Sequence, residues 1–286
     1  MKPAIMRRLV AAELMKVRTT ASWWYYLAGF GVLAAGALTN NWFSHHYQLH
    51  PQADLPDRAQ ALAAAAQART PSGTAAIAAS MITSGDFLTA LFAILLGVHI
   101  AANEFAQRTA TVTFLTVPRR GRVVAAKVAA AACAGAVFWL AATLLNGIGT
   151  GVFLRTEHLS GALTGVTAAR SAGMALPVYV LSAVAGVGLG ALIRSQLAAV
   201  ITAIAAYAGG FALVELVSHL VYDLARQGWV LGLPVAAPPL ADIVMTSSGS
   251  AFPHAPPPWT GAAVMAGYAL ALAAAGTAAI RARDVS

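Results

Sequence analysis

Few side chains in this sequence have the types and spacing that carry chemistry. The single cysteine, Cys133, sits in an apolar run, so it forms no intramolecular disulfide, and no cysteine–histidine cluster has zinc-site spacing. The sequence contains no G-x-x-x-x-G-K-[ST] phosphate loop, no H-E-x-x-H motif and no paired acids within an apolar stretch. It therefore indicates that the chain is not an enzyme and does not itself bind ATP through such a loop.

The one gathering of metal-type ligands follows the first apolar stretch. His45, His46, His50 and Asp54 come within ten residues of one another, in a region rich in polar residues. Imidazole and carboxylate groups bind transition metals, but the same residues are common on solvated surfaces. We interpret them as part of a solvated polar loop, with an extracellular metal site as the alternative.

The most unusual connection is the segment 103–127, NEFAQRTATVTFLTVPRRGRVVAAK, which lies between two stretches apolar enough to be membrane spans. It carries five basic residues: Arg108, Arg119, Arg120, Arg122 and Lys127. A basic anchor on anionic lipid headgroups, at ~1 kcal/mol per charge, would account for these residues alone. It would not account for the apolar, threonine-rich insert before them, because links between helices are usually short.

The apolar part of this segment therefore favours docking to a partner over lipid anchoring. Phe114 and Leu115 would each contribute ~1.5–3 kcal/mol if a partner's groove buried them. The threonines lower helix propensity, so a helix here needs tertiary support. Pro118 marks its expected end.

Composition places the whole chain in a membrane. Of 286 residues, 59% are hydrophobic and 10% charged, with a mean hydropathy of +0.70, whereas soluble domains carry about 25% charged residues. A helical span needs ~20 apolar residues. We therefore predict an all-α polytopic integral membrane protein with one domain, 1–286, rather than a nucleic-acid-binding protein. The six predicted transmembrane helices are 22–39, 87–102, 128–152, 171–193, 197–218 and 260–280.

Charge orients these spans. With the N-terminus inside, thirteen Lys and Arg residues face the cytoplasm and five face outward, as the positive-inside rule favours. Both termini and 103–127 are then cytoplasmic, and 40–86 and 219–259 are extracellular. The apolar piece 229–245 is interrupted by prolines, so we expect it to lie at the interface or to re-enter the membrane. A cleaved signal peptide is the alternative interpretation of the first span.

Two further features concern the helices themselves. Within 1–21, Met6, Val10, Leu14 and Val17 recur at helical spacing among basic residues, which predicts an interfacial helix on the inner membrane surface. Small-residue pairs in the spans, Gly186 with Gly190 and Gly147 with Gly151, predict close helix packing.

Asn146 and Glu215 are the polar residues of the spans with the best claim on a transport pathway. A helix–helix hydrogen bond is the favoured role for Asn146. Simple solvation near the outer surface is an equal alternative for Glu215.

Several short stretches together resemble the permease subunits of type-2 ABC transporters (ABC-2 permeases). They are ELMKVRTT at 13–20, EF at 104–105, RTAT at 108–111, TFL at 113–115, PRR at 118–120, RSQ at 194–196 and RDV at 283–285. The resemblance covers the full length, and it depends on the order and spacing of these stretches. No single stretch is a specific signature.

The resemblance implies a cytoplasmic coupling helix near 104–115 and a separate ATP-binding subunit, in two copies, that holds ATP and Mg²⁺. A second permease copy would complete the unit, as a homodimer rather than a heterodimer, among the lipids of a bacterial cytoplasmic membrane. The expected docking residues are Glu104, Arg108, Phe114, Leu115, Arg119 and Arg120. The expected function is export of an amphipathic, lipid-like, drug or peptide cargo, with no cofactor in this chain. A non-transporting scaffold or sensor that recruits a cytoplasmic partner is the alternative.

Overall fold

A computed structural model describes residues 3–20, 22–52, 57–106, 120–159, 165–193, 195–247 and 254–282, and over these residues it contains helices and no strand. The first half of the chain forms α1 (Pro3–Thr19), α2 (Ser22–Leu49), α3 (Arg58–Ala68), α4 (Pro71–Ile82), α5 (Asp86–Ala106) and α7 (Arg120–Thr156). The second half forms α8 (Val166–Leu192), α9 (Gln196–Ile204), the π-helical turn η1 (Ala205–Gly209), α10 (Gly210–Ala225), the 3₁₀ segment η2 (Gly228–Ala236), α11 (Pro238–Thr246) and α12 (Pro258–Ala282).

Five stretches of the described chain are long and apolar enough to cross a membrane. They are Pro71–Asn103, Gly121–Thr156, Val166–Leu192, Gln196–Leu224 and Pro258–Ile280. These stretches contain the last five predicted spans, apart from one residue at the end of 171–193. The first predicted span, 22–39, lies in α2, which is not among them. Helix α2 opens with two tryptophans and two tyrosines and ends with polar residues, so its hydropathy is lower.

Helix α8 lies at the centre of the bundle and packs against α5, α7 and α12. Small residues permit this close approach. A Cβ added at Gly186 would meet the carbonyl oxygen of Ile94 in α5, and one added at Gly188 would meet the backbone of Leu272 in α12. By contrast, a Cβ added at Gly147 would meet nothing within 4 Å. The expectation of close packing therefore holds at Gly186, whereas no described part of this chain packs closely against Gly147.

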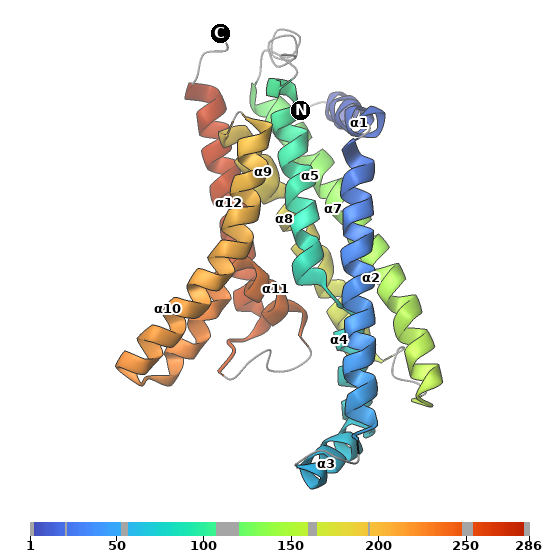
Figure 1. Ribbon diagram of the computed structural model, residues 1–286. Coiled ribbons are helices and arrows are strands. Elements are labelled where there is room, and N and C mark those ends of the chain that lie inside the picture. Colours follow the sequence, from blue (N-terminus) through green and yellow to red (C-terminus); the bar gives the residue numbers. More distant parts are fainter. Residues whose placement is uncertain are drawn as a thin grey trace.

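The region 40–85, expected to be a long outer connection, is mostly helical. Helix α2 continues ten residues beyond the predicted end of the first span, and α3 and α4 follow it (Figure 1). Thr70 caps α4, because its Oγ1 accepts a hydrogen bond from the Gly73 amide, and Pro71 occupies the first helical position. The hydropathy of this region falls before its helical structure ends, so the helix continues beyond the end of the predicted span.

Helix α11 packs against α12, α8 and α5, although it belongs to the segment 219–259 that we expected outside or at the interface. Figure 1 shows it beside α12, within the space between α10 and the rest of the bundle. Ala241 and Met245 of α11 pack with Val178 and Met265 in one buried cluster. Several apolar residues of this piece, including Val230, Leu240 and Val244, are therefore buried, whereas Leu233 is exposed.

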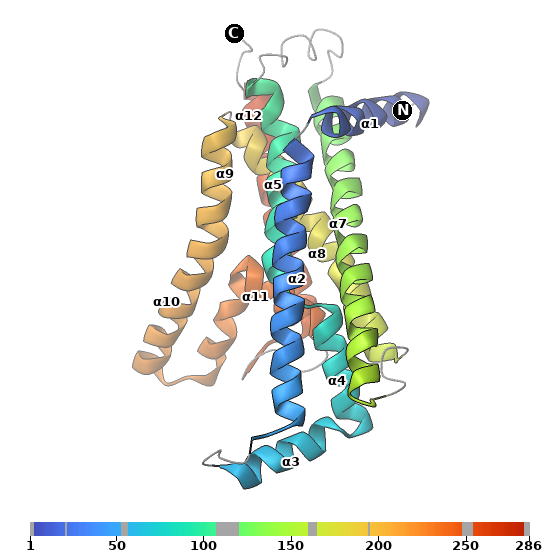
Figure 2. The same ribbon diagram turned by 45° about the vertical axis from the view of Figure 1, so that its right-hand side comes forward.

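The described chain begins and ends at the same end of the bundle, and α3 lies at the opposite end (Figure 1). Helix α1 lies across the terminal end, at a steep angle to α2 (Figure 2). Its apolar residues at helical spacing are half-buried, whereas Arg7 and Arg8 are exposed. Buried Glu13 accepts a hydrogen bond from Lys127 Nζ of α7 at 2.8 Å, which ties α1 to the bundle.

Candidate functional site

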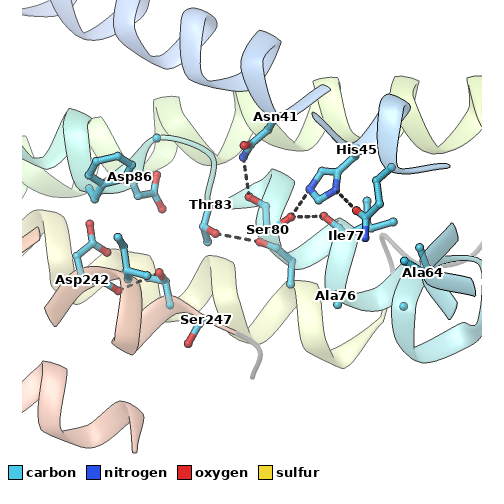
Figure 3. A pocket seen from close by; sticks show the side chains of 18 of the residues that line it. Asn41, His45, Ala64, Ala76, Ile77, Ser80, Thr83, Asp86, Asp242 and Ser247 are labelled. Atoms are coloured by element: carbon cyan, nitrogen blue, oxygen red, sulfur yellow. Dashed lines mark hydrogen bonds between the residues drawn. The ribbon is translucent and has the colours of Figure 1, made fainter. Parts of the chain in front are cut away.

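A cavity of about 660 Å³ opens between the far end of α2, helices α3 and α4, the start of α5, and α11. Its polar lining comes from distant parts of the sequence. Figure 3 shows Asn41 and His45 of α2 on one wall, and Asp86 and Asp242 together at one end. The cavity therefore combines these polar groups with a lining that is otherwise largely apolar.

Asp86 is the first residue of α5 and is buried. Tyr179 Oη, from the central helix α8, donates a hydrogen bond to Asp86 Oδ1 at 2.9 Å. The same hydroxyl lies 2.6 Å from Thr89 Oγ1. Asp86 thus has a fixed position and a hydrogen-bond donor that restrains it.

Asp242 of α11 differs, because neither of its carboxyl oxygens has a hydrogen-bond partner among the described residues. The residue is only 1% exposed. Burial, and then the neighbouring charge of Asp86, raise the pKa of Asp242 well above its ordinary value. A buried carboxyl without a partner is costly unless it takes up a proton or a cation. The two acids therefore form a site with affinity for positive charge.

A break between α4 and α5 sets the position of Asp86. The chain turns at Gly85, whose φ of +72° suits glycine. Asn146 of α7 donates hydrogen bonds from Nδ2 to the carbonyl oxygens of Ile82 and Ser84, at 3.2 and 3.1 Å. The side chain of Asn146 thus satisfies backbone groups that the break leaves unpaired.

Tyr207 contacts the start of α5, next to Asp86. It lies in η1, the π-helical turn between α9 and α10, and is buried while most residues around it are exposed. Its hydroxyl donates to the carbonyl oxygen of Phe87. The extra residue of a π turn rotates the side chains that follow it, and such turns are frequent at functional sites.

His45 lines the cavity between the acids and α3. Its Nε2 lies 2.7 Å from Ser80 Oγ and its Nδ1 lies 3.2 Å from Gln48 Oε1. Burial lowers the pKa of His45, and the hydrogen bond with Gln48 only partly offsets this effect. The wall opposite the acids therefore offers neutral hydrogen-bonding groups.

The predicted docking residues fall where the structure gives no side chains. Four of them lie outside the described residues: Arg108, Phe114, Leu115 and Arg119. The other two belong to described helices, Glu104 to α5 and Arg120 to α7, but the structure describes only their backbone. Their predicted role stays a prediction.

The two predicted pathway residues do not line the cavity. Asn146 is fully buried and contacts the backbone before α5, as described above. Glu215 is partly exposed on α10, with His219 Nε2 at 3.6 Å from its Oε2. Asn146 therefore contacts the turn that precedes Asp86, and Glu215 is outside the cavity lining.

Sequence reasoning missed Asp86 and Asp242 as a pair. Each is a lone acid in apolar sequence, SGDFLTALF and PPLADIVMT, and this isolation is the signal that could have identified them. Asp86 directly precedes a predicted span, where an acid is usually solvated. Only the fold shows that both are buried and that they share one cavity.

Comparison with known proteins does not assign the chain to a family. The chain matches no family model, and no curated protein matches it.

Proposed function

We propose that the chain is the membrane-spanning permease subunit of an ATP-driven exporter, and that its cavity accepts the cationic group of an amphipathic cargo. The observation that carries this proposal is buried Asp242, without a hydrogen-bond partner in the described chain, beside Asp86 in a polar cavity. Ionisable groups inside a membrane protein usually face a substrate pathway. The apolar residues of the cavity wall suit the rest of an amphipathic molecule.

Three observations support the ABC-2 type of permease. The sequence has no phosphate loop, as expected when a separate subunit hydrolyses ATP. Helix α1 is amphipathic and lies across the end of the bundle. Helix α5 ends and helix α7 begins at that same end. We place this end in the bacterial cytoplasm, because it carries most of the basic residues.

The working unit would contain two permease copies and two ATPases that bind ATP and Mg²⁺. Closure of the ATPases would move the two coupling segments together and shift the helices between two packings. A ligand or partner shifts such an equilibrium only through contacts that differ between the two states. The ion pair between Glu13 and Lys127 would transmit this motion, because it fixes α1 to α7 beside the coupling segment.

The test begins with co-purification of the chain and its ATP-binding partner in mild detergent, followed by reconstitution into liposomes. We expect amphipathic cations to stimulate ATP hydrolysis more than neutral or anionic analogues of the same apolar size. Asp242→Asn removes the charge but keeps the side-chain shape, so we expect stimulation to fall by about tenfold and thermal stability to rise.

Asp223→Asn is the matched control, because Asp223 is exposed near the end of α10 and should change neither quantity. Equal stimulation by cations and anions would contradict the cavity assignment. Absence of any ATPase partner would favour the scaffold or sensor instead.

A further inference from the structure

A second polar cluster lies outside the cavity, where the far ends of α2 and α7 meet. His46 lies in the last turn of α2, and His50 directly follows that helix. The His50 amide donates to the His46 carbonyl oxygen at 3.0 Å, so the two residues keep the i, i+4 spacing that places side chains on one face. His46 Nδ1 lies 2.7 Å from Glu157 Oε1, and His50 Nε2 lies 2.7 Å from Glu157 Oε2. The ligand atoms of the three residues all lie within 4.8 Å of one another.

The end of α7 holds Glu157 in a defined position. His158 adopts a left-handed conformation with φ of 56°, and its amide donates to Arg155 O at 3.2 Å. The Leu159 amide donates to Leu154 O at 2.7 Å. These two bonds form a Schellman motif, which is a rigid helix ending. The carboxylate is therefore presented by an ordered backbone and not by a loose loop.

Apolar packing beneath the cluster fixes α2 against α7. The rings of Trp42 and Phe153 meet edge to face, with centroids 5.1 Å apart. Leu49, Leu154 and Leu159 are buried in the same group of side chains. The two histidines and the glutamate thus come from two elements whose relative position is already set.

We propose that His46, His50 and Glu157 form a binding site for a divalent transition metal ion, with zinc as the best match. Two imidazole nitrogens and one carboxylate oxygen are ordinary zinc ligands, and two histidines at helical spacing i, i+4 are a common way to present them. Calcium and magnesium are a poor match, because they prefer oxygen ligands. Within the described chain this is the one group of three such residues whose ligand atoms converge.

To hold the ion, the ligand atoms must move to tetrahedral spacing, and a separation as wide as 4.8 Å would shorten by about 1.5 Å. Ligands about 2.0–2.2 Å from a tetrahedral zinc lie roughly 3.3 Å apart, so the two contacts of 2.7 Å would lengthen by about half an ångström. The side chains of His46 and His50 are 44% and 50% exposed, whereas that of Glu157 is 7% exposed. An ion can therefore enter from solvent. A water molecule or a further ligand can complete the coordination on the exposed side.

Zinc at this site would join the far ends of α2 and α7, at the end of the bundle opposite the termini. This inference does not depend on the transport function, because the ligands lie outside the cavity residues. It revises our interpretation of 45–54 as a solvated polar loop. His46 belongs to α2 and His50 directly follows it, His45 faces the cavity, and Asp54 lies outside the described residues.

The experiment uses the full-length protein in detergent, with any affinity tag removed and metals stripped by a chelator. After equilibration with zinc and removal of the excess, elemental analysis should find one zinc per chain. Zinc should also raise the melting temperature of the wild-type protein, because a ligand that binds only the folded state stabilises it. Substituted cobalt should give the visible absorption of a tetrahedral site.

His50→Ala and Glu157→Gln should each weaken zinc binding by more than the roughly 10–100-fold cost of losing an outer-shell partner. His219→Ala is the matched control, since His219 also lies beside a glutamate on one helix but belongs to no group of three ligands in the described chain. Size-exclusion profiles show whether each variant folds.

Failure of the wild-type protein to bind zinc or to gain thermal stability from it would overturn the proposal, whatever the variants do. Equal zinc binding by folded Glu157→Gln would overturn it too. The cluster would then be a hydrogen-bonded clamp only.

Discussion

The carboxylate of Glu13 joins three helices at the end of the bundle that holds the termini. It accepts from Lys127 Nζ of α7 and from Lys16 Nζ of its own helix, each at 2.8 Å, and Lys127 also donates to the Ile100 carbonyl of α5 at 3.1 Å. Glu13 and Lys127 are 6% and 5% exposed. Because both charges are removed from water, each depends on the other for its stability.

Glu13→Gln should therefore destabilise the protein strongly. The change leaves the Lys127 ammonium buried without its counter-charge, a loss of about 3–5 kcal/mol for pairs of this kind. The measurement is the unfolding midpoint of detergent-solubilised protein, followed by fluorescence-detected size exclusion. We expect Glu13→Leu combined with Lys127→Met to recover most of the loss, because apolar residues replace both charges.

Lys16→Met is the control for this experiment. The side chain of Lys16 is 45% exposed, and an exposed ion pair contributes about 0–1 kcal/mol, so its loss should change the midpoint little. If Glu13→Gln unfolds at the wild-type midpoint, the pair does not hold α1 in place.

Sequence patterns predicted the positions of some of these residues but not their partners. The spacing of Met6, Val10, Leu14 and Val17 predicted an interfacial helix, and Lys127 was expected just before a span. Their pairing depends on how α1 crosses the bundle, and no local pattern encodes that angle. Asp86 and Asp242 pose the same difficulty, because lone acids become a site only when tertiary packing brings them together.

Among the elements, the break between α4 and α5 controls the cavity most directly. It ends α4, which lines one wall, and starts α5 at Asp86. An unbroken helix from Pro71 to Asn103 would have all its backbone groups paired internally. The break leaves the carbonyl oxygens of Ile82 and Ser84 for Asn146 to satisfy.

Gly85→Ala should disturb this break. The residue has a left-handed φ, and an added Cβ would overlap the Cβ of Ala37 in α2. Left-handed strain costs about 1–2 kcal/mol in a residue with a Cβ, and overpacking adds about 1–3 kcal/mol. We expect a lower unfolding midpoint and reduced binding of cationic cargo in an equilibrium assay.

Gly31→Ala in α2 provides a matched control. An added Cβ there meets nothing within 4 Å, and alanine favours a helix by up to about 1 kcal/mol. It should therefore be neutral or slightly stabilising. If Gly85→Ala behaves like Gly31→Ala, the turn at Gly85 does not position Asp86.

The elements also show where prediction from hydropathy stops working. Spans are recognised because about 20 apolar residues must be consecutive, and five were found in this way. Helix α2 continues through TNNWFSHHYQL, where polar side chains end the apolar signal without ending the helix. Helix α11 was not predicted, because its sequence is short and begins with two prolines, yet it packs against α12, α8 and α5.

At the scale of the whole molecule, the two ends of the bundle have different chemistry. One end holds the described ends of the chain, helix α1 and the buried ion pair. The opposite half holds the polar cavity and the histidine–glutamate cluster. Between them, α10 exposes Leu213, Leu216 and Leu220, which suit contact with lipid chains. A partner that docks at the terminal end, as we propose, would therefore have to act on the cavity through the helices.

Phe114→Ala tests this transmission. If Phe114 anchors the coupling segment in the ATPase, its loss removes ~1.5–3 kcal/mol of burial at that contact. The reconstituted complex should then still hydrolyse ATP while the number of cargo molecules moved per ATP falls by about tenfold or more.

Phe211→Ala is the matched control, because Phe211 is partly exposed on α10, far along the chain from the coupling segment. It should leave the ratio of transport to hydrolysis unchanged. Transport at the wild-type ratio in Phe114→Ala would remove the coupling segment from this position. A parallel fall in Phe211→Ala would instead indicate a general loss of folded protein.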